Sequence, residues 1–254
     1  MLQKWIGGKM KKWFALLYFA MSMLLPSISI AGDAKLIQWH STNIQLLRGY
    51  DFELGVEERT ISTFEHVSGW VFGDIFTFAD LIWPDGDDFT YYAEFSPRFS
   101  LSKISGRDFS TGIIKDVLVS TTIEKPKDQQ ERYLYGAAVD FNIPGFAFFN
   151  SNYYVRDNPN LEGKTWQITL AWKRLFKLGH TSWVTEGFAD FFGSEGRTRP
   201  NQLIVPRLLV DIGEHVGLSK NKLWSGIEYS YWHNKFGVDG VTESVVQLQI
   251  KWEL

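Results

Sequence analysis

The sequence ends on ESVVQLQIKWEL, residues 243–254, and from Val246 onward apolar and polar side chains alternate without a break. The apolar positions are Val246, Leu248, Ile250, Trp252 and Leu254. The positions between them are Gln247, Gln249, Lys251 and Glu253. Because successive side chains of a β-strand point to opposite faces, this two-residue period predicts a strand with one apolar and one polar face.

Segments with the same period recur along the chain, separated by turn residues. In KTWQITLAWK (164–173), for example, Trp166, Ile168 and Leu170 share one face. Interruptions such as WPDGDD (83–88) are rich in Pro, Gly and Asp, which favour turns. We predict no helix in this part of the chain. About twelve strands are predicted, near residues 40–49, 58–68, 70–80, 89–101, 109–123, 131–141, 146–156, 164–174, 181–192, 201–212, 222–233 and 243–254.

An even number of antiparallel strands can close into a barrel with both chain ends on one side. A water-soluble barrel buries its apolar face, whereas a membrane barrel turns that face to lipid and keeps a polar lumen. Large aromatics such as Trp166 and Trp252 lie at strand ends, as in an interfacial girdle, and charges such as Arg98 lie within strands. An Arg facing lipid at the midplane would cost roughly 2–4 kcal/mol, so the charged faces must turn inward. The sequence therefore predicts an all-β fold, a transmembrane antiparallel β-barrel, over residues 32–254.

The first 31 residues have the organisation of a secretory signal peptide. Three lysines between positions 9 and 12 precede the apolar run WFALLYFAMSMLL (13–25), which is too short to span a bilayer. Ser29-Ile30-Ala31 then supplies small residues for cleavage. We expect residues 1–31 to be removed after Ala31 and the remaining chain to reach the outer membrane of a Gram-negative bacterium.

Charge and the final strand restrict the partners. Without residues 1–31, which contain four lysines and no acid, the formal net charge falls from −3 to −7, and this argues against a nucleic-acid partner. The chain has no cysteine, so its rigidity needs a source other than disulfides, and closure of the barrel is one candidate. The terminal strand Val246–Leu254 resembles the outer-membrane insertion signal, with Leu254 where Phe is usual. The expected partners are therefore outer-membrane lipids and the barrel-assembly machinery.

Three segments carry a resemblance to a known family: GDIFTFADL (73–81), AEFSPRFSLSKI (93–104) and YSYWHN (229–234), while DFSTGIIKDVLV (108–119) and YGAAVDFNIPG (135–145) keep that family's order. They resemble motifs of the nucleoside-specific outer-membrane channel family, the Tsx-like and OmpK-like proteins. The resemblance covers most of the chain after residue 31. It implies a narrow twelve-stranded barrel whose lumen binds nucleosides through paired aromatics and ionisable groups.

A nucleoside-selective pore needs aromatic walls for the flat base and polar groups for the ribose. Phe76 and Phe78 share a face with Asp74 and Asp80, and two acids favour a luminal position for that face; the alternative is that these rings face lipid. The remaining charged positions either contact the solute or form a structural charge ladder that fills the lumen. The candidate luminal residues are Phe72, Asp74, Phe76, Phe78, Asp80, Glu94, Arg98, Glu186, Phe188, Asp190, Arg207, Asp211, Trp224, Glu228 and Trp232.

Enzymatic constellations are missing from the sequence. The five histidines are scattered, and the adjacent His40 and Ser41 would point to opposite faces of a strand. No His or Cys spacing matches a metal site. We therefore expect no catalytic residues, no metal and no other cofactor.

Three functions fit these patterns to different degrees. The first is passive, selective diffusion of nucleosides or similar small solutes, since no energy-coupling plug domain is visible. The alternative is a barrel plugged by its charge ladder, which acts as a surface adhesin or as a receptor for phage or bacteriocin. A third, an enzyme at the barrel rim, would need a role for His40 or His233.

Overall fold

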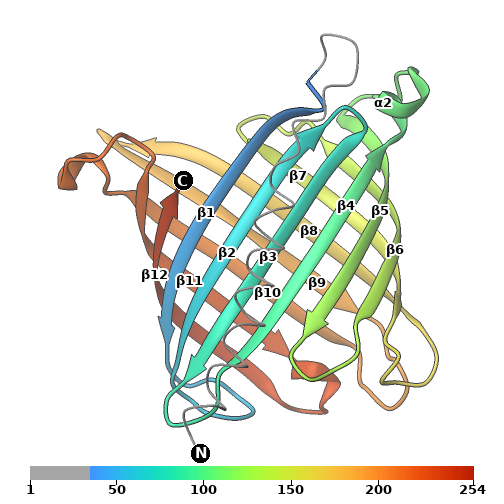
Figure 1. Cartoon of the computed structure of the whole chain (residues 1–254), viewed down its shortest axis with the longest axis vertical. Helices are drawn as coiled ribbons and strands as arrows, with labels where there is room; N and C mark the ends of the chain where they lie inside the picture. Colours follow the sequence, from blue (N-terminus) through green and yellow to red (C-terminus); the bar gives the residue numbers. More distant parts are fainter. Residues whose placement is uncertain (1–34) are drawn as a thin grey trace, which may run out of the picture. The chain divides into compact units, whose positions relative to one another are not determined.

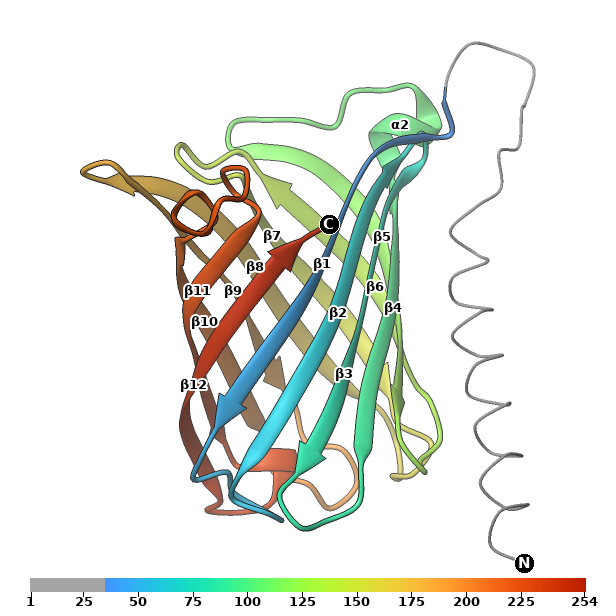
Figure 2. The same ribbon diagram turned by 60° about the vertical axis from the view of Figure 1, so that its left-hand side comes forward.

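The computed structural model describes residues 35–254, and the predicted signal peptide (1–31) lies outside this range. The described chain forms one closed barrel of antiparallel strands, each paired with its neighbours in sequence, and the last strand pairs with the first (Figures 1 and 2). The strands are β1 (Ile37–Gly49), β2 (Arg59–Trp70), β3 (Gly73–Pro84), β4 (Thr90–Ser100), β5 (Ile114–Pro126), β6 (Arg132–Phe141), β7 (Phe148–Asp157), β8 (Thr165–Leu178), β9 (Thr181–Phe192), β10 (Asn201–Asp211), β11 (Leu223–His233) and β12 (Thr242–Glu253). The predicted fold class and strand number are confirmed.

The closing strand β12 shows which way the faces point. Leu248 and Ile250 are 68% and 49% exposed, whereas Gln249 and Lys251 are 1% exposed. The apolar face of the terminal stretch is therefore on the outside of the barrel, and its polar face is on the inside. This arrangement is the inside-out orientation that the alternation predicts.

The seam between β1 and β12 removes the sheet edge over seven residue pairs, from Asn43 opposite Glu253 to Gly49 opposite Gln247. Because the middle of β1 pairs with the end of β12 and the strands are antiparallel, the beginning of β1 and the end of β12 point to the same end of the barrel (Figure 2). We call this the terminus end. An unpaired edge would leave backbone donors and acceptors unsatisfied, so closure lets a sheet this large stand in an apolar environment.

The expectation of no helix is wrong. The connection from β4 to β5 contains the short helix α2 (Leu101–Ser105), and two 3₁₀ turns, η1 (Glu214–Val216) and η2 (Lys235–Gly237), lie in later connections. In α2, the Ser100 hydroxyl caps the first turn by accepting the Lys103 backbone N–H at 3.0 Å, and Gly106 ends the helix with φ of 69°. A single turn of this kind is held by its caps and carries no apolar periodicity to detect. No helix in the described residues is long and apolar enough to cross a membrane.

Several strand boundaries differ from the prediction by three residues or more, including the start of β1 at 37 and the end of β8 at 178; two of the shifts follow from turns. β3 continues beyond residue 80 to Pro84, because the turn comes only at Gly86, with φ of 79°. β5 begins at Ile114 instead of 109, because Gly112, with φ of 56°, places a turn before it. Both shifts follow from residues in the left-handed conformation, which Gly adopts readily.

Candidate functional site

An accessible aromatic segment lies on the inner face of β3 and β4. The ring centroids of Phe76 and Phe78 are 5.8 Å apart, and those of Phe78 and Tyr92 are also 5.8 Å apart. The strand register places Glu94 opposite Phe78 and Asp80 opposite Tyr92. All five side chains are half-buried, so they keep surface toward the lumen. We call Phe76, Phe78 and Tyr92 the aromatic wall.

The two carboxylates beside the aromatic wall make only local hydrogen bonds. The Tyr92 hydroxyl donates to Glu94 Oε1 at 2.6 Å, and the Thr63 hydroxyl donates to Asp80 Oδ1 at 2.5 Å. A carboxylate offers about four lone-pair sites, so both groups keep acceptor capacity for a further donor. The wall thus combines flat apolar rings with hydrogen-bond acceptors.

A second accessible group lies on the opposite side of the barrel. Phe188 and Asp190 are half-buried on the inner face of β9, which is as far from β3 as the closed ring of strands allows. Asp190 Oδ1 accepts hydrogen bonds from Thr169 Oγ1 at 2.5 Å and from Gln167 Nε2 at 3.2 Å. Aromatic rings and carboxylates therefore line the lumen from two sides.

Ion pairs pack the inner face of another part of the barrel, with side chains from β9, β10, β11, β12 and β2. Lys251 Nζ lies 2.6 Å from Glu186 Oε1, and Arg207 Nε lies 2.5 Å from Glu228 Oε2. Arg207 also reaches Glu65 on β2, with Nη1 to Oε2 at 3.7 Å. Two of these pairs join strands that are not neighbours. We call Glu65, Glu186, Arg207, Glu228 and Lys251 the ionic wall.

Buried amides complete the ionic wall. Gln249 donates to Gln45 Oε1 at 2.5 Å, Gln247 donates to Glu228 Oε1 at 2.7 Å, and Asn43 donates to Glu65 Oε1 at 3.0 Å. Gln45 and Gln249 are at most 1% exposed. Side chains thus fill this side of the lumen and bond mainly to one another, while the buried Oε1 atoms of Gln247 and Gln249 have no hydrogen-bond partner among residues 35–254.

A further ion pair lies toward the end opposite the termini. Arg156 Nη1 and Nη2 lie 2.5 Å and 2.7 Å from the two carboxylate oxygens of Glu124, and Arg156 also donates to Gln167 Oε1 at 2.6 Å. The Arg156 and Glu124 side chains are 9% and 4% exposed. This is a bidentate ion pair, in which Nη1 and Nη2 of the guanidinium each bind one carboxylate oxygen. The pair fixes β5 against β7.

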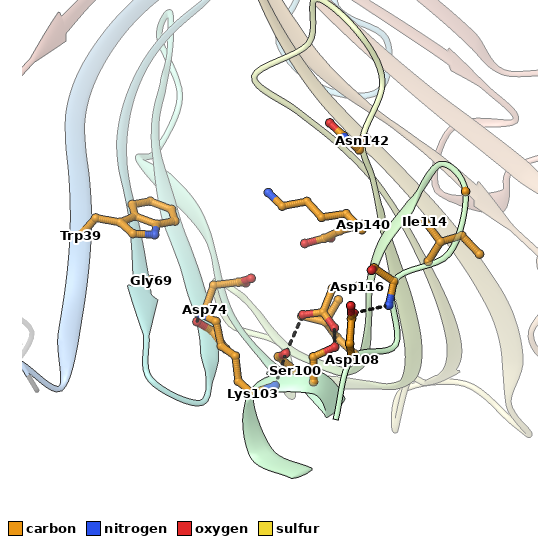
Figure 3. Close-up of a pocket in the computed structure, with 16 residues that line it drawn as sticks. Trp39, Gly69, Asp74, Ser100, Lys103, Asp108, Ile114, Asp116, Asp140 and Asn142 are labelled. Carbon is orange, nitrogen blue, oxygen red and sulfur yellow. Dashed lines mark hydrogen bonds between the residues drawn. The ribbon is translucent and has the colours of Figure 1, made fainter. Parts of the chain in front are cut away.

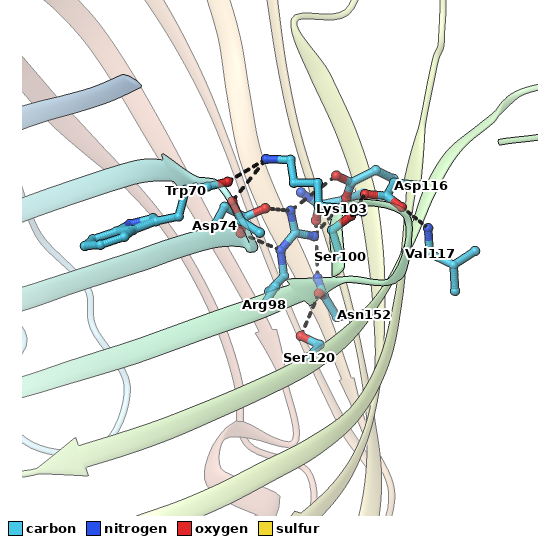
Figure 4. Close-up of polar contacts among 12 residues, drawn as sticks. Trp70, Asp74, Arg98, Ser100, Lys103, Asp116, Val117, Ser120 and Asn152 are labelled. Atoms are coloured by element: carbon cyan, nitrogen blue, oxygen red, sulfur yellow. Dashed lines mark hydrogen bonds and ion pairs between the residues drawn. The ribbon is translucent and has the colours of Figure 1, made fainter. Parts of the chain in front are cut away.

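At the terminus end, Arg98 links two acids (Figure 4). Its Nε and Nη2 lie 2.8 Å from the two oxygens of Asp74, and its Nη1 lies 2.9 Å from Asp140 Oδ1. Close by, Asp116 accepts the hydroxyls of Ser100 at 2.5 Å and Ser102 at 2.8 Å. Four strands, β3 to β6, contribute to this network, so it holds this end of the barrel wall together.

A cavity of about 540 Å³ opens beside this network (Figure 3). Trp39 of β1 lines one side with Asp74 near it on β3, and Asp116, Asp140 and Asn142 lie across the space. This volume lies within the range of small-molecule sites, about 300–1,000 Å³. The cavity is the terminus end of the lumen, and the β4–β5 connection borders it.

Most of the sequence-predicted residues lie on the inner face, and they separate into different environments. Phe76, Phe78, Asp80 and Glu94 form or adjoin the aromatic wall, while Phe188 and Asp190 face them from β9. Asp74 and Arg98 pair at the terminus end, and Glu186, Arg207 and Glu228 belong to the ionic wall. That any of them contacts a solute stays a prediction.

Asp211, Trp224 and Trp232 have structural surroundings. Asp211 accepts the backbone N–H groups of Gly213 at 3.0 Å and Asn221 at 2.7 Å, which stabilises the β10–β11 turn. Trp224 is 4% exposed and packs in a small apolar cluster with two other buried side chains, Val184 and Leu209. At the opposite end, Trp232 donates its indole N–H to Asn201 at 3.1 Å.

The expected luminal position of Phe72 is corrected. Phe72 lies in the turn between β2 and β3, not within the strand, and its ring stacks on Phe99 at 5.7 Å between centroids. Phe99 pairs with the exposed Val119 and lies on the outer face of β4. The two-residue period assigned Phe72 to the inner face, but the turn at Val71 and Phe72 interrupts that period.

Several inner-face residues were not among the candidates from the sequence. Tyr92 completes the aromatic wall, Lys251 and Glu65 complete the ionic wall, and Glu124 and Arg156 form a buried pair. Their faces follow from the same two-residue period. The period does not predict which residues they pair with, because the partners lie on strands distant in sequence and their positions depend on strand register.

Two of the histidines lie together on the outer face. His40 and His66 stack with ring centroids 6.1 Å apart, and His66 Nδ1 shares a hydrogen bond with Thr42 at 2.7 Å. These residues alternate with the buried Asn43 and Gln45, so they lie on the outer face. Within residues 35–254, no group of His, Cys, Asp and Glu is arranged to hold a metal ion.

Comparison with known proteins concerns the fold alone. No protein-family model and no curated protein matches this sequence. A solved structure of a KdgM porin in complex with disordered oligogalacturonate is similar, with 7% sequence identity and a TM-score of 0.49 over 83% of this chain and 98% of that chain. The resemblance to nucleoside-specific channels therefore stays a prediction from the sequence motifs.

Proposed function

We propose that this protein is a passive outer-membrane channel, selective for nucleosides and similar small neutral solutes that carry an aromatic ring and hydroxyl groups. One observation carries the proposal. The aromatic wall, with Glu94 and Asp80 beside it, stays accessible on the inside of a closed barrel whose outer face is apolar.

The membrane location follows from the two faces of the barrel wall. Exposed outer residues include Leu248, Ile250 and Trp252, whereas Lys251 and Glu186 are buried inside. This distribution favours lipid outside and a polar interior. The predicted signal peptide and the insertion-like terminal strand, Val246–Leu254, support export and delivery to the barrel-assembly machinery.

The chemistry of the aromatic wall suits a nucleoside. A base resting on Phe76 or Phe78 would gain about 1–3 kcal/mol per stacked ring. Ribose hydroxyls can donate to Glu94 and Asp80, which keep free acceptor positions. Conduction requires weak binding, and a Kd of about 1 mM, or about 4 kcal/mol, would let the solute leave again.

Liposome swelling tests the proposal. Vesicles containing the folded protein should take up adenosine and thymidine faster than they take up glucose or sucrose. Uptake no faster than into protein-free vesicles would exclude a channel. Equal rates for adenosine and for sugars of similar size would leave a channel without the proposed selectivity.

The ionic wall favours the second candidate, a plugged barrel that acts as a surface adhesin or as a receptor for phage or bacteriocin. Arg207 with Glu65, and Lys251 with Glu186, bridge non-neighbouring strands inside the lumen. If these pairs seal the pore, a planar bilayer containing the protein will carry no current above that of the lipid. A stable ion conductance in the same bilayer would reject the plugged barrel.

A further inference from the structure

The cavity at the terminus end has features of a binding site that the aromatic wall does not explain. We call the space bounded by Trp39, Asp74, Asp116, Asp140 and Asn142 the vestibule. Its volume, about 540 Å³, is ample for a nucleoside-sized solute. Figure 3 shows Trp39 and Asp74 on one side and Asp116, Asp140 and Asn142 on the other.

The backbone holds Trp39 flat against the inner wall. A Cβ atom at Gly69 would lie 2.1 Å from Trp39 Nε1 and 2.4 Å from its Cε2, so only glycine lets the indole lie against β2. Trp39 nevertheless remains 52% exposed. Among residues 35–254, no hydrogen bond uses its indole nitrogen. The vestibule thus contains an exposed aromatic ring, Trp39, that is fixed against β2 and whose indole N–H makes no hydrogen bond in the described part of the chain.

The rest of the vestibule wall offers acceptors and an amide. Each oxygen of Asp74 and Asp140 receives one hydrogen bond from Arg98, which leaves further acceptor capacity on both carboxylates. Asn142 is exposed, and within the described residues its side-chain amide makes no hydrogen bond. These planar polar groups face an aromatic ring across one space, as recognition of a ring with hydroxyl substituents requires.

We propose that the vestibule is a second solute-binding site, in which the ring of a nucleoside stacks on Trp39 while its hydroxyls bind Asp74, Asp140 and Asn142. The identity of the solute rests on the proposed function, whereas the site itself rests on the cavity. A free neutral sugar also has a ring with hydroxyl groups and could bind the same residues. The test therefore compares a nucleoside with free sugars.

Cysteine protection tests the site directly, because the natural chain has no cysteine. Ser110 lines the vestibule, and its side chain is exposed, so Ser110→Cys should react with a water-soluble maleimide. Adenosine at about 10 mM, tenfold above a millimolar Kd, should slow that reaction severalfold. Ser194→Cys, in the exposed β9–β10 connection at the other end, should react equally with and without adenosine. Glucose and ribose in parallel samples separate a nucleoside site from a sugar site.

Loss of the platform should remove the protection. In the Ser110→Cys background, Trp39→Ala should raise the adenosine concentration for half-protection about tenfold, as expected for one lost base–aromatic stack. Trp39→Phe keeps a ring and should retain most of the protection. Trp166→Ala is the matched control, since Trp166 is also 52% exposed but lies on the outer face.

The outcomes separate this site from the channel function. Protection that needs Trp39 supports the vestibule. Equal protection with Trp39→Ala, or none in a protein that takes up adenosine into liposomes, overturns the vestibule and leaves the channel. Protection without uptake keeps the site and rejects the channel. Equal protection by glucose and by adenosine would overturn the nucleoside assignment.

Discussion

The aromatic wall and the ionic wall share one inner surface, yet they differ in accessibility and in the range of their contacts. Phe78 and Tyr92 are half-buried, and Tyr92 bonds to Glu94 only two residues away. Lys251 is 1% exposed and pairs with Glu186 on a strand that is not its neighbour. The local contacts of the aromatic wall leave its side chains accessible to a solute. The contacts of the ionic wall cross the barrel and therefore hold the shape of the lumen.

This difference predicts that the ionic wall carries stability and the aromatic wall carries selectivity. A buried charge that loses its partner destabilises a fold strongly, because it is neither hydrated nor compensated. Lumen-facing rings such as Phe76 contribute less, since a membrane barrel is held by its backbone ladder and its lipid-facing surface. Substitutions in the two walls should therefore affect different measurements.

The largest expected effect is on stability, at Lys251. Lys251→Met removes the closest cation of Glu186 and leaves it buried with Lys173, 3.1 Å away, and with Arg207, which lies opposite it in the strand register. We expect a loss of about 3 kcal/mol in the free energy of unfolding, measured by urea titration in lipid vesicles. Lys125→Met is the matched control, because Lys125 pairs with Glu131 at 2.9 Å but both side chains are at least 40% exposed. Equal urea midpoints for the two variants would contradict the claim that the ionic wall stabilises the fold more than an exposed ion pair does.

A double variant tests whether the charge pairing of Glu186 with Lys251, or only the packing of their side chains, stabilises the ionic wall. Glu186→Gln combined with Lys251→Met removes both charges, and buried ion pairs replaced together often cost little. We expect the double variant to recover most of the stability lost in Lys251→Met alone. Its single-channel conductance should also rise, since two charged side chains no longer close that side of the lumen. An unstable double variant would mean that packing, not charge pairing, stabilises this wall.

Selectivity should respond to the aromatic wall. Phe76→Ala with Phe78→Ala should lower the ratio of adenosine to glucose uptake about tenfold, as expected from losing base stacking worth about 1–3 kcal/mol. The urea midpoint should stay close to wild type. Phe95→Ala, on the outer face of β4 and 46% exposed, serves as the control and should leave the ratio unchanged. An unchanged ratio in the double variant would exclude this wall as the selective element.

The smallest effect is expected at Tyr92. Tyr92→Phe keeps the ring but removes the hydroxyl that donates to Glu94 at 2.6 Å. Because stacking is retained and Glu94 remains accessible, adenosine uptake should change less than about threefold, corresponding to a net hydrogen bond of about 0.5 kcal/mol. A loss as large as that in the Phe76 and Phe78 variant would show that the hydroxyl, not the ring, contacts the solute.

The fold could be predicted because its determinants are local. Alternation such as that in 243–254 specifies both a strand and its faces, and turn residues such as Gly86 mark the ends of strands. The exceptions are short. Helix α2 depends on two caps, at Ser100 and Gly106, and Phe72 lies in a turn where the period stops.

The candidate site could be predicted only in part, because the face of a residue is local information and its partner is not. The period places Glu186 and Arg207 on the inner face, but nothing in the sequence pairs Glu186 with Lys251 or Arg207 with Glu65. Those contacts depend on the register of strands far apart in the chain. The division into an accessible and a buried wall therefore required the structure.

The central claim is that solutes pass along the aromatic wall while the ionic wall stays closed. Single-channel recording in a planar bilayer, with adenosine added to the solution, tests it most directly. We expect an ion current that adenosine partly blocks, with half-block at about 1 mM. A membrane that carries no protein-dependent current, or a current that adenosine leaves unchanged up to its solubility limit, would contradict the claim.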